Sequence, residues 1–156
     1  MALYAGRKMV YLEIDSSQIP LDLLLEADPS EASISSYLSD SWCFTALDKG
    51  QAFGVCVVKP QRFALAEIYN VAVSPSHQGK GIGTKLLEFV LSQLPNKGVK
   101  RVELGTGTFG YQLIYYQRLG FRVDAIIKDH FLLNYSAPIF ENGIQHKDML
   151  RLYLQL

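Results

Sequence analysis

The sequence has little of what is typical of disulfide-bonded, metal-binding or polyanion-binding proteins. Only two of its 156 residues are cysteines, Cys43 and Cys56, and both lie in apolar runs, so we predict buried free thiols. The three histidines have no spacing typical of a metal site, and we expect no bound metal. The formal net charge is zero, so neither a nucleic acid nor a membrane is expected as a partner.

Long hydrophobic runs are also missing. No stretch is long enough to cross a bilayer, and Arg7 and Lys8 are not followed by the apolar run of a signal peptide. Repeats, linkers and low-complexity segments are not found either. Together with an apolar content of 49%, the length predicts one cytoplasmic domain, residues 1–156, whose core needs neither metal nor disulfide.

The sequence does contain an alternation of strand-like and helix-like segments. Strands are predicted at residues 9–14, 42–47, 52–59, 63–73, 101–104, 121–127 and 148–156. Helices are predicted at residues 20–27, from an acidic cap at Asp28 to Leu38, at 82–94 and at 111–119. Lys49-Gly50 and Asn142-Gly143 are typical of hairpin turns. This order predicts an α/β fold with a mixed, mostly antiparallel sheet and helices on both faces.

The chain is organised around a strand, a glycine turn and a helix at residues 69–94. Glycines at 79, 81 and 83 allow a tight turn just where the first turn of a helix has unpaired N–H donors and a partial positive charge. Such a turn suits a phosphate or pyrophosphate, beside which Lys80 adds a positive charge. The alternative is that the glycines only allow helix and strand to pack closely.

The spacing of this turn excludes two common nucleotide motifs. A Walker A loop needs Ser or Thr after the Gly-Lys pair, where this chain has Gly81. The dinucleotide fingerprint needs glycine at its sixth place, which here holds Thr84.

Two motifs in this order resemble the GNAT N-acetyltransferase family. The first is Gln78-x-x-Gly81-x-Gly83, and the second is Tyr116-x-x-x-Gly120-Phe121. The resemblance covers about residues 42–127, and residues 129–149 are similar to an elaboration found in a bacterial, small-domain branch of the family. Many members carry Asn shortly before the second motif, where this chain has Phe109 and Gly110.

The resemblance implies an enzyme that transfers the acetyl group of acetyl-CoA to a primary amine of a small molecule or protein by direct attack. It implies that the pantetheine arm binds along the strand and the pyrophosphate on the loop, through Val71, Ala72, Val73, Gln78, Gly79, Lys80, Gly81, Ile82, Gly83 and Thr84. It also implies that Tyr116 points at the thioester sulfur, where a phenol could protonate the leaving thiolate. A homodimer is possible, because the family often dimerises.

The catalytic base is predicted from the strand before the loop. Alternation places Glu67 on one face with apolar residues, namely Phe63, Leu65, Tyr69, Val71 and Val73. Desolvation raises the pKa of a carboxylate, so Glu67 is predicted to be the general base, acting through a water. The alternative is an edge-exposed or salt-bridged Glu67. Tyr115, rotated about 100° from Tyr116, is predicted to pack in the core.

The acceptor is predicted to contact the segment before the last strand. The candidate residues are His130, Tyr135, Phe140 and Glu141. The carboxylates of Asp129 and Glu141 would suit a cationic acceptor.

Two other functions remain open at this point. One is a non-catalytic, acyl-CoA-binding sensor. The other is a nucleotide- or SAM-binding, methyltransferase-type domain that uses Gly105-x-Gly107-x-x-Gly110, although too few residues follow for a doubly wound fold.

Overall fold

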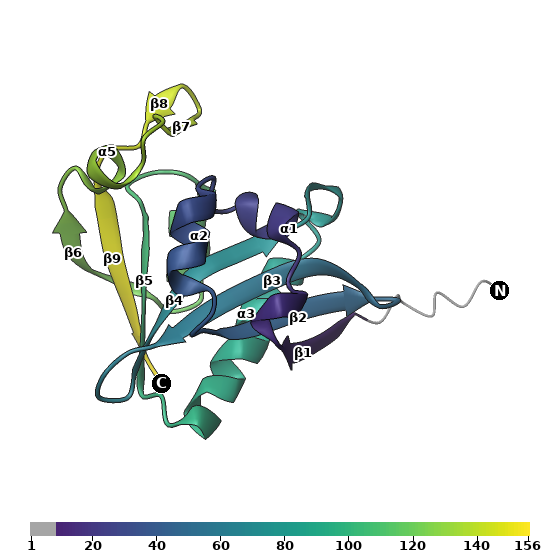
Figure 1. The fold of residues 1–156 in the computed structure, drawn as a ribbon. Helices are drawn as coiled ribbons and strands as arrows, with labels where there is room; N and C mark the ends of the chain where they lie inside the picture. The colour runs from purple at the N-terminus through teal and green to yellow at the C-terminus, as the bar shows by residue number, and fades with distance from the viewer. Residues whose placement is uncertain (1–8) are drawn as a thin grey trace.

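The computed structural model describes residues 9–156, which form a seven-stranded sheet with helices packed on it (Figure 1). The strands of this sheet are β1 (Val10–Ile14), β2 (Trp42–Asp48), β3 (Gln51–Pro60), β4 (Leu65–Val73), β5 (Arg101–Gly107), β6 (Arg122–Ile127) and β9 (Met149–Gln155). The helices are α1 (Leu21–Leu25), α2 (Glu31–Tyr37), α3 (Ile82–Gln93), α4 (Tyr111–Arg118) and α5 (His130–Asn134). Short 3-10 helices occur at η1 (Ser16–Gln18), η2 (Pro75–His77) and η3 (Leu94–Lys97). A separate hairpin consists of β7 (Phe140–Glu141) and β8 (Ile144–Gln145).

The sheet has the strand order β1-β2-β3-β4-β5-β9-β6. Only β4 and β5 are parallel, and every other neighbouring pair in this sheet is antiparallel. The predicted fold class, a mixed and mostly antiparallel sheet, is confirmed.

Helices pack on both faces of the sheet. Successive side chains of β3 point to opposite faces, and the apolar residues on each face are covered by helices. Val55 and Val57 pack with buried residues of α1 and α2, which lie in front of the sheet in Figure 1. Cys56 and Val58 belong to a second cluster with Leu86, Leu87, Val90 and Leu94 of the α3 region. Both cysteines are free and buried, as predicted. None of the helices in the described residues is long and apolar enough to span a membrane.

A bulge in β4 corrects the predicted alternation of this strand. The pairing with β3 skips Tyr69, so Ile68 and Asn70 pair with consecutive residues of β3. Ile68 and Val71 therefore both pack in the core under α3, whereas Asn70 bonds to the α1 side. Phe63 lies before the strand with φ 57° and is 97% exposed. The prediction of a single apolar face for residues 63–73 was wrong.

Two helix details also differ from the sequence prediction. The cap of α2 is Ser30, whose Oγ accepts from the Ser33 N–H at 3.1 Å, and not Asp28. Helical spacing predicts one apolar face of α4 from Tyr111, Ile114, Tyr115 and Leu119, but Tyr111 and Ile114 are exposed. The predicted hairpin turns are confirmed by positive φ angles of 50° and 77° at residues 49 and 50, and of 51° and 76° at residues 142 and 143.

Candidate active site

A cleft opens where β4 and β5 separate. The two strands pair only between Leu65–Ile68 and residues 101–104, whereas β4 continues to Val73 and β5 to Gly107. A cavity of about 390 Å³ lies along the second half of β4, the glycine turn and α4. The predicted cofactor residues that line it are Val71, Ala72, Val73, Gln78, Gly79, Gly81, Ile82, Gly83 and Thr84. Lys80 is exposed and does not line this cavity.

The glycine turn has the geometry of an anion site. Gly79 and Gly81 have φ angles of 75° and 78°, the left-handed region that favours glycine. Gly81 is the N-cap of the twelve-residue helix α3, and within residues 9–156 no side-chain hydrogen bond caps this helix end. The first N–H groups of α3 are therefore left for a ligand, at the positive end of the helix dipole. Gln78 fixes the turn to β4, because its Nε2 donates to the Val73 carbonyl at 3.1 Å.

Tyr116 lies at the junction of this cleft with a second cavity, and it lines both. The Tyr116 ring packs edge-on against the Phe121 ring, with a centroid distance of 6.0 Å. It packs at a tilt against the Tyr115 ring, with a centroid distance of 5.3 Å. Burial raises the pKa of the Tyr116 phenol well above its usual value, so the phenol keeps its proton at neutral pH. Tyr115 also packs against the core, as predicted, and its Oη lies close to Gly83.

The second cavity, of about 860 Å³, lies between α2, β4, β5, α5 and the segment before β9. Four carboxylates line it, with one guanidinium. The carboxylates belong to Glu26, Asp28, Glu67 and Glu141, and the guanidinium to Arg151. The excess of carboxylates favours a cationic ligand.

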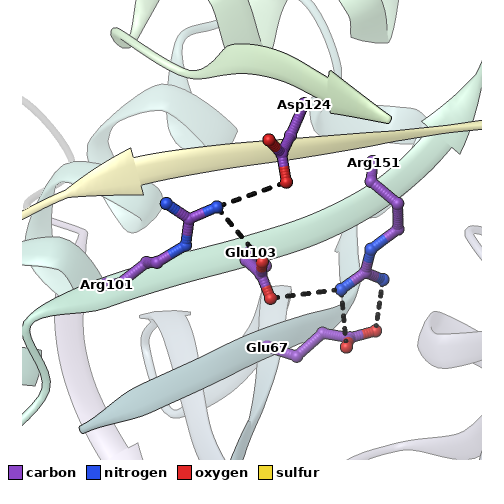
Figure 2. Close-up of polar contacts among 5 residues, drawn as sticks. All are labelled: Glu67, Arg101, Glu103, Asp124 and Arg151. Carbon is purple, nitrogen blue, oxygen red and sulfur yellow. Dashed lines mark hydrogen bonds and ion pairs between the residues drawn. The ribbon is translucent and has the colours of Figure 1, made fainter. Parts of the chain in front are cut away.

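Glu67 lies in this cavity and is ion-paired, which is the alternative that the sequence left open beside a desolvated general base. Both its oxygens accept from Arg151, each at 3.0 Å, and Arg151 also lies 3.5 Å from Glu103 (Figure 2). Arg101 continues the network, at 3.3 Å from Glu103 and 3.4 Å from Asp124. The hydrogen bonds that Arg151 donates to Glu67 raise the pKa of Arg151, so this side chain stays charged.

Three of the four predicted acceptor residues line the second cavity, namely His130, Tyr135 and Glu141. Desolvation, followed by the charge of Arg151, lowers the pKa of His130. The Tyr135 hydroxyl donates to Asp28 at 3.2 Å. Phe140 is 61% exposed and does not line the cavity, so the structure does not bring it to the others.

His146, which with His130 flanks the segment before β9 in the sequence and was a further candidate for binding the acceptor, is 8% exposed and also lines the second cavity. The Nε2 atom of His146 is 2.9 Å from Oε1 of Glu141. The His146 ring stacks on the Phe109 ring, with a centroid distance of 4.1 Å and an interplanar angle of 4°. Sequence reasoning missed Arg151. In β9, Leu150, Leu152 and Leu154 alternate with Arg151 and Tyr153. Successive side chains of a strand point to opposite faces, so this alternation could have shown that Arg151 faces the polar side of the sheet.

The Gly105-x-Gly107-x-x-Gly110 motif has a packing role here. A β-carbon at Gly105 would lie 2.2 Å from Met149, and one at Gly107 would lie 2.3 Å from His146. At Gly110 it would lie 2.7 Å from Glu141. These glycines make room for side chains of the same chain, which removes the observation that favoured a methyltransferase-type domain.

Known proteins with a similar sequence and fold bear on the identity of this site. The sequence profile of the Acetyltransferase (GNAT) family matches residues 11–121. An uncharacterized N-acetyltransferase of Bacillus subtilis, YvbK, is 44% identical over 136 residues, which cover 86% of this chain and 88% of that protein. The solved IAA acetyltransferase from Bacillus cereus is 40% identical with a TM-score of 0.91, and the alignment covers 96% of this chain and 100% of that one.

A GNAT family acetyltransferase from Elizabethkingia anophelis, solved with acetyl-CoA bound, is 39% identical. Its TM-score is 0.90, and the alignment covers 95% of this chain and 98% of that one. The profile thus spans most of the chain, and each of these relatives aligns over nearly its whole length. The chain belongs to the GNAT family of acetyltransferases.

Proposed function

We propose that this N-acetyltransferase uses acetyl-CoA as donor and transfers the acetyl group to a primary amine by direct attack. The observation that carries the proposal is the position of Tyr116, which lines both the cleft beside the glycine turn and the acidic second cavity. A donor bound in the first space and an amine bound in the second would meet at this residue. The acetyl-CoA complex of the Elizabethkingia anophelis relative supports the choice of donor.

The first space offers groups that suit the chemistry of the donor. The N-terminus of α3 and the left-handed glycines suit the pyrophosphate, and the backbone of Val71 to Val73 lines the way toward Tyr116. Beyond Ile68, β4 pairs with none of the residues that the structure describes on the β5 side, so its backbone groups there are available to the amides of a pantetheine arm.

The chemistry requires a base for the amine and an acid for the thiolate. An alkylamine with a pKa near 10.4 is neutral in roughly one molecule in 2,500 at pH 7, which costs about 4.6 kcal/mol. The neutral amine attacks the carbonyl carbon, the C–N bond forms and the C–S bond breaks. Tyr116 gives its phenol proton to the sulfur and recovers one from the new amide nitrogen.

The acceptor is proposed to be cationic, because the carboxylates that line the second cavity outnumber its guanidinium. Glu67 as the general base stays a prediction. With both oxygens bound to Arg151, it could take a proton only through a water or after the pair opens. A cytoplasmic location and a homodimer also stay predictions.

The test is a steady-state assay of free CoA thiol with acetyl-CoA and a panel of spermidine, kanamycin, lysine and a peptide with a free α-amino group. Amine-dependent release of CoA, with the acetylated amine identified by mass spectrometry, would support the proposal. Calorimetric titration with acetyl-CoA separates binding from turnover. Tight binding without release to any amine would instead indicate an acyl-CoA sensor.

A further inference from the structure

We propose that Glu26 binds the positively charged nitrogen of the acceptor at the place where the two cavities meet. This inference rests on the proposed function and names the residue that selects a cationic amine for it. Glu26 is the C-cap of α1, which Figure 1 shows in front of the sheet together with α2. It belongs neither to the glycine turn nor to the Tyr116 motif.

Glu26 lies at the junction of the two cavities. The described residues that line both the cleft beside the glycine turn and the second cavity are Glu26, Ala27, Val71, Gln112 and Tyr116. Glu26 is the one charged side chain in this set. The donor is proposed to reach Tyr116, so its thioester would lie at the same junction as the Glu26 carboxylate.

Glu26 is also the carboxylate of the second cavity that is free to take a cation. Both oxygens of Glu67 accept from Arg151. Glu141 is bound through Oε1 to His146 Nε2 at 2.9 Å. The Glu26 side chain is exposed, and within residues 9–156 it makes no hydrogen bond or ion pair. An exposed and unpaired carboxylate can take an ammonium group without first breaking a contact of the protein.

Asp28, the remaining carboxylate of this cavity, helps to build the cavity wall. Its Oδ1 accepts from the Ser30 N–H at 3.1 Å and from the Tyr135 hydroxyl at 3.2 Å. Its Oδ2 accepts from the Tyr37 hydroxyl at 3.1 Å, and the residue is only 6% exposed. Burial and three donors give Asp28 a structural role, which leaves Glu26 to bind the cation.

The turn that carries Glu26 is fixed on β4. The Leu24 carbonyl accepts from Asn70 Nδ2 at 3.0 Å and from the Asp28 N–H at 3.1 Å. Asn70 precedes Val71, where the pantetheine arm is proposed to bind. The end of α1 is therefore tied to the strand that would hold the donor, while the Glu26 side chain stays free to contact the acceptor.

The acceptor nitrogen is positively charged at two stages of the proposed reaction. At pH 7 nearly all of an alkylamine arrives as ammonium. The neutral amine that attacks becomes positive again in the tetrahedral intermediate, because it gives its lone pair to the carbonyl carbon. A carboxylate at the junction stabilises the nitrogen at both stages through a charge-assisted hydrogen bond. Glu26 exchanges no proton in this role, so its loss should raise KM for the amine and change kcat little.

The experiment compares the wild type, Glu26→Gln and Glu31→Gln in steady-state kinetics at saturating acetyl-CoA, with the amine of the panel that reacts fastest. We expect Glu26→Gln to raise KM for the amine about tenfold and to change kcat less than about threefold. Glu31→Gln is the same substitution at an exposed residue of α2 that lines neither cavity, and it should keep the wild-type KM. Added salt should raise KM of the wild type more than KM of Glu26→Gln.

Calorimetry tests the same contact without turnover. That amine, or spermidine if no amine reacts, is titrated into each protein saturated with CoA, whose binding shows that the variant is folded. We expect Glu26→Gln to weaken the amine about tenfold, and Glu26→Asp, which keeps the charge on a shorter side chain, to weaken it less.

A folded Glu26→Gln with the wild-type KM and amine affinity would overturn the inference, while acetylation by the wild type would leave the proposed function intact. A wild type that acetylates no amine would contradict the proposed function, and the titration with spermidine would still decide on Glu26. In that case, spermidine that does not bind the wild type, or that binds Glu26→Gln equally well, would overturn the inference.

Discussion

Replacing Tyr116 by phenylalanine tests the core of the proposed chemistry with the smallest possible change. The ring and its packing against Phe121 and Tyr115 stay, and only the hydroxyl is lost. Within the described residues this hydroxyl has no hydrogen-bond partner. Because a typical hydrogen bond contributes about 1 kcal/mol net, and none is broken, the free energy of unfolding should change by less than that amount.

The expected loss of rate is much larger than the loss of stability. A positioned acid contributes at least about 10²-fold, which at 1.36 kcal/mol per factor of ten is about 2.7 kcal/mol of transition-state stabilisation. Burial raises the pKa of the phenol, and the proton-donating form is lost only as the pH rises through that raised pKa. In the wild type, Tyr116 should therefore cause no decline in rate below about pH 10.

The assay is kcat at saturating acetyl-CoA, together with denaturant unfolding of the same preparations. Tyr115→Phe is the matched control, since it also removes one buried hydroxyl from the same helix but should lower kcat much less. Equal kcat values for Tyr116→Phe and the wild type would mean that water or another group protonates the thiolate. A large loss of stability in Tyr116→Phe would refute the structural part of the reasoning.

Three further predictions concern the donor site, the ion pair and His130. Gly81→Asp should weaken acetyl-CoA binding by at least about tenfold, or 1.4 kcal/mol, whereas Gly81→Asn keeps the backbone strain without the charge and should weaken it less; equal affinities in calorimetry would remove the turn from the donor site. Glu67→Gln should lower the free energy of unfolding by about 1–3 kcal/mol, measured by denaturant unfolding. Removing one partner of a buried ion pair typically costs about 3–5 kcal/mol, but here Arg151 keeps Glu103 as a partner. If Glu67 were the base, this variant would also lower kcat near neutral pH by about 10²-fold or more. His130 should titrate by NMR below the ordinary histidine value, and because its folded pKa is lowered, its contribution to stability is present at neutral pH and is lost as the pH falls through that pKa.

The backbone geometry of the glycine turn was predictable from the sequence because it depends on a few adjoining residues. Left-handed φ angles at residues 79 and 81 require glycine, and a helix must begin directly after them, so a short stretch of sequence contains most of the information. The cleft residues from Val71 to Thr84 were found for this reason, apart from Lys80, which the structure leaves outside the cavity.

The second cavity could not be predicted in the same way, because its residues come from distant segments. The pair between Glu67 and Arg151 joins residues 84 positions apart, and Asp28 meets Tyr135 across 107 positions. A bulge that skips Tyr69 also changes which side chains of β4 share a face, and nothing in the alternation of residues 63–73 indicates its position. Such contacts depend on strand order and register, which periodicity alone does not determine.

The two glycine motifs of this chain show why spacing alone does not identify a ligand site. At Gly79 and Gly81, a β-carbon would meet no atom of the described residues within 4 Å apart from the adjoining chain, so the space in front of the turn is open to a ligand. At Gly105 and Gly107 the same space holds the side chains of Met149 and His146. A glycine in a sequence indicates that something must come close to the backbone or that φ must be positive, but not which of the two applies. In this chain the motif closer to the dinucleotide pattern makes room for the chain's own side chains, and the weaker match leaves room for an anion.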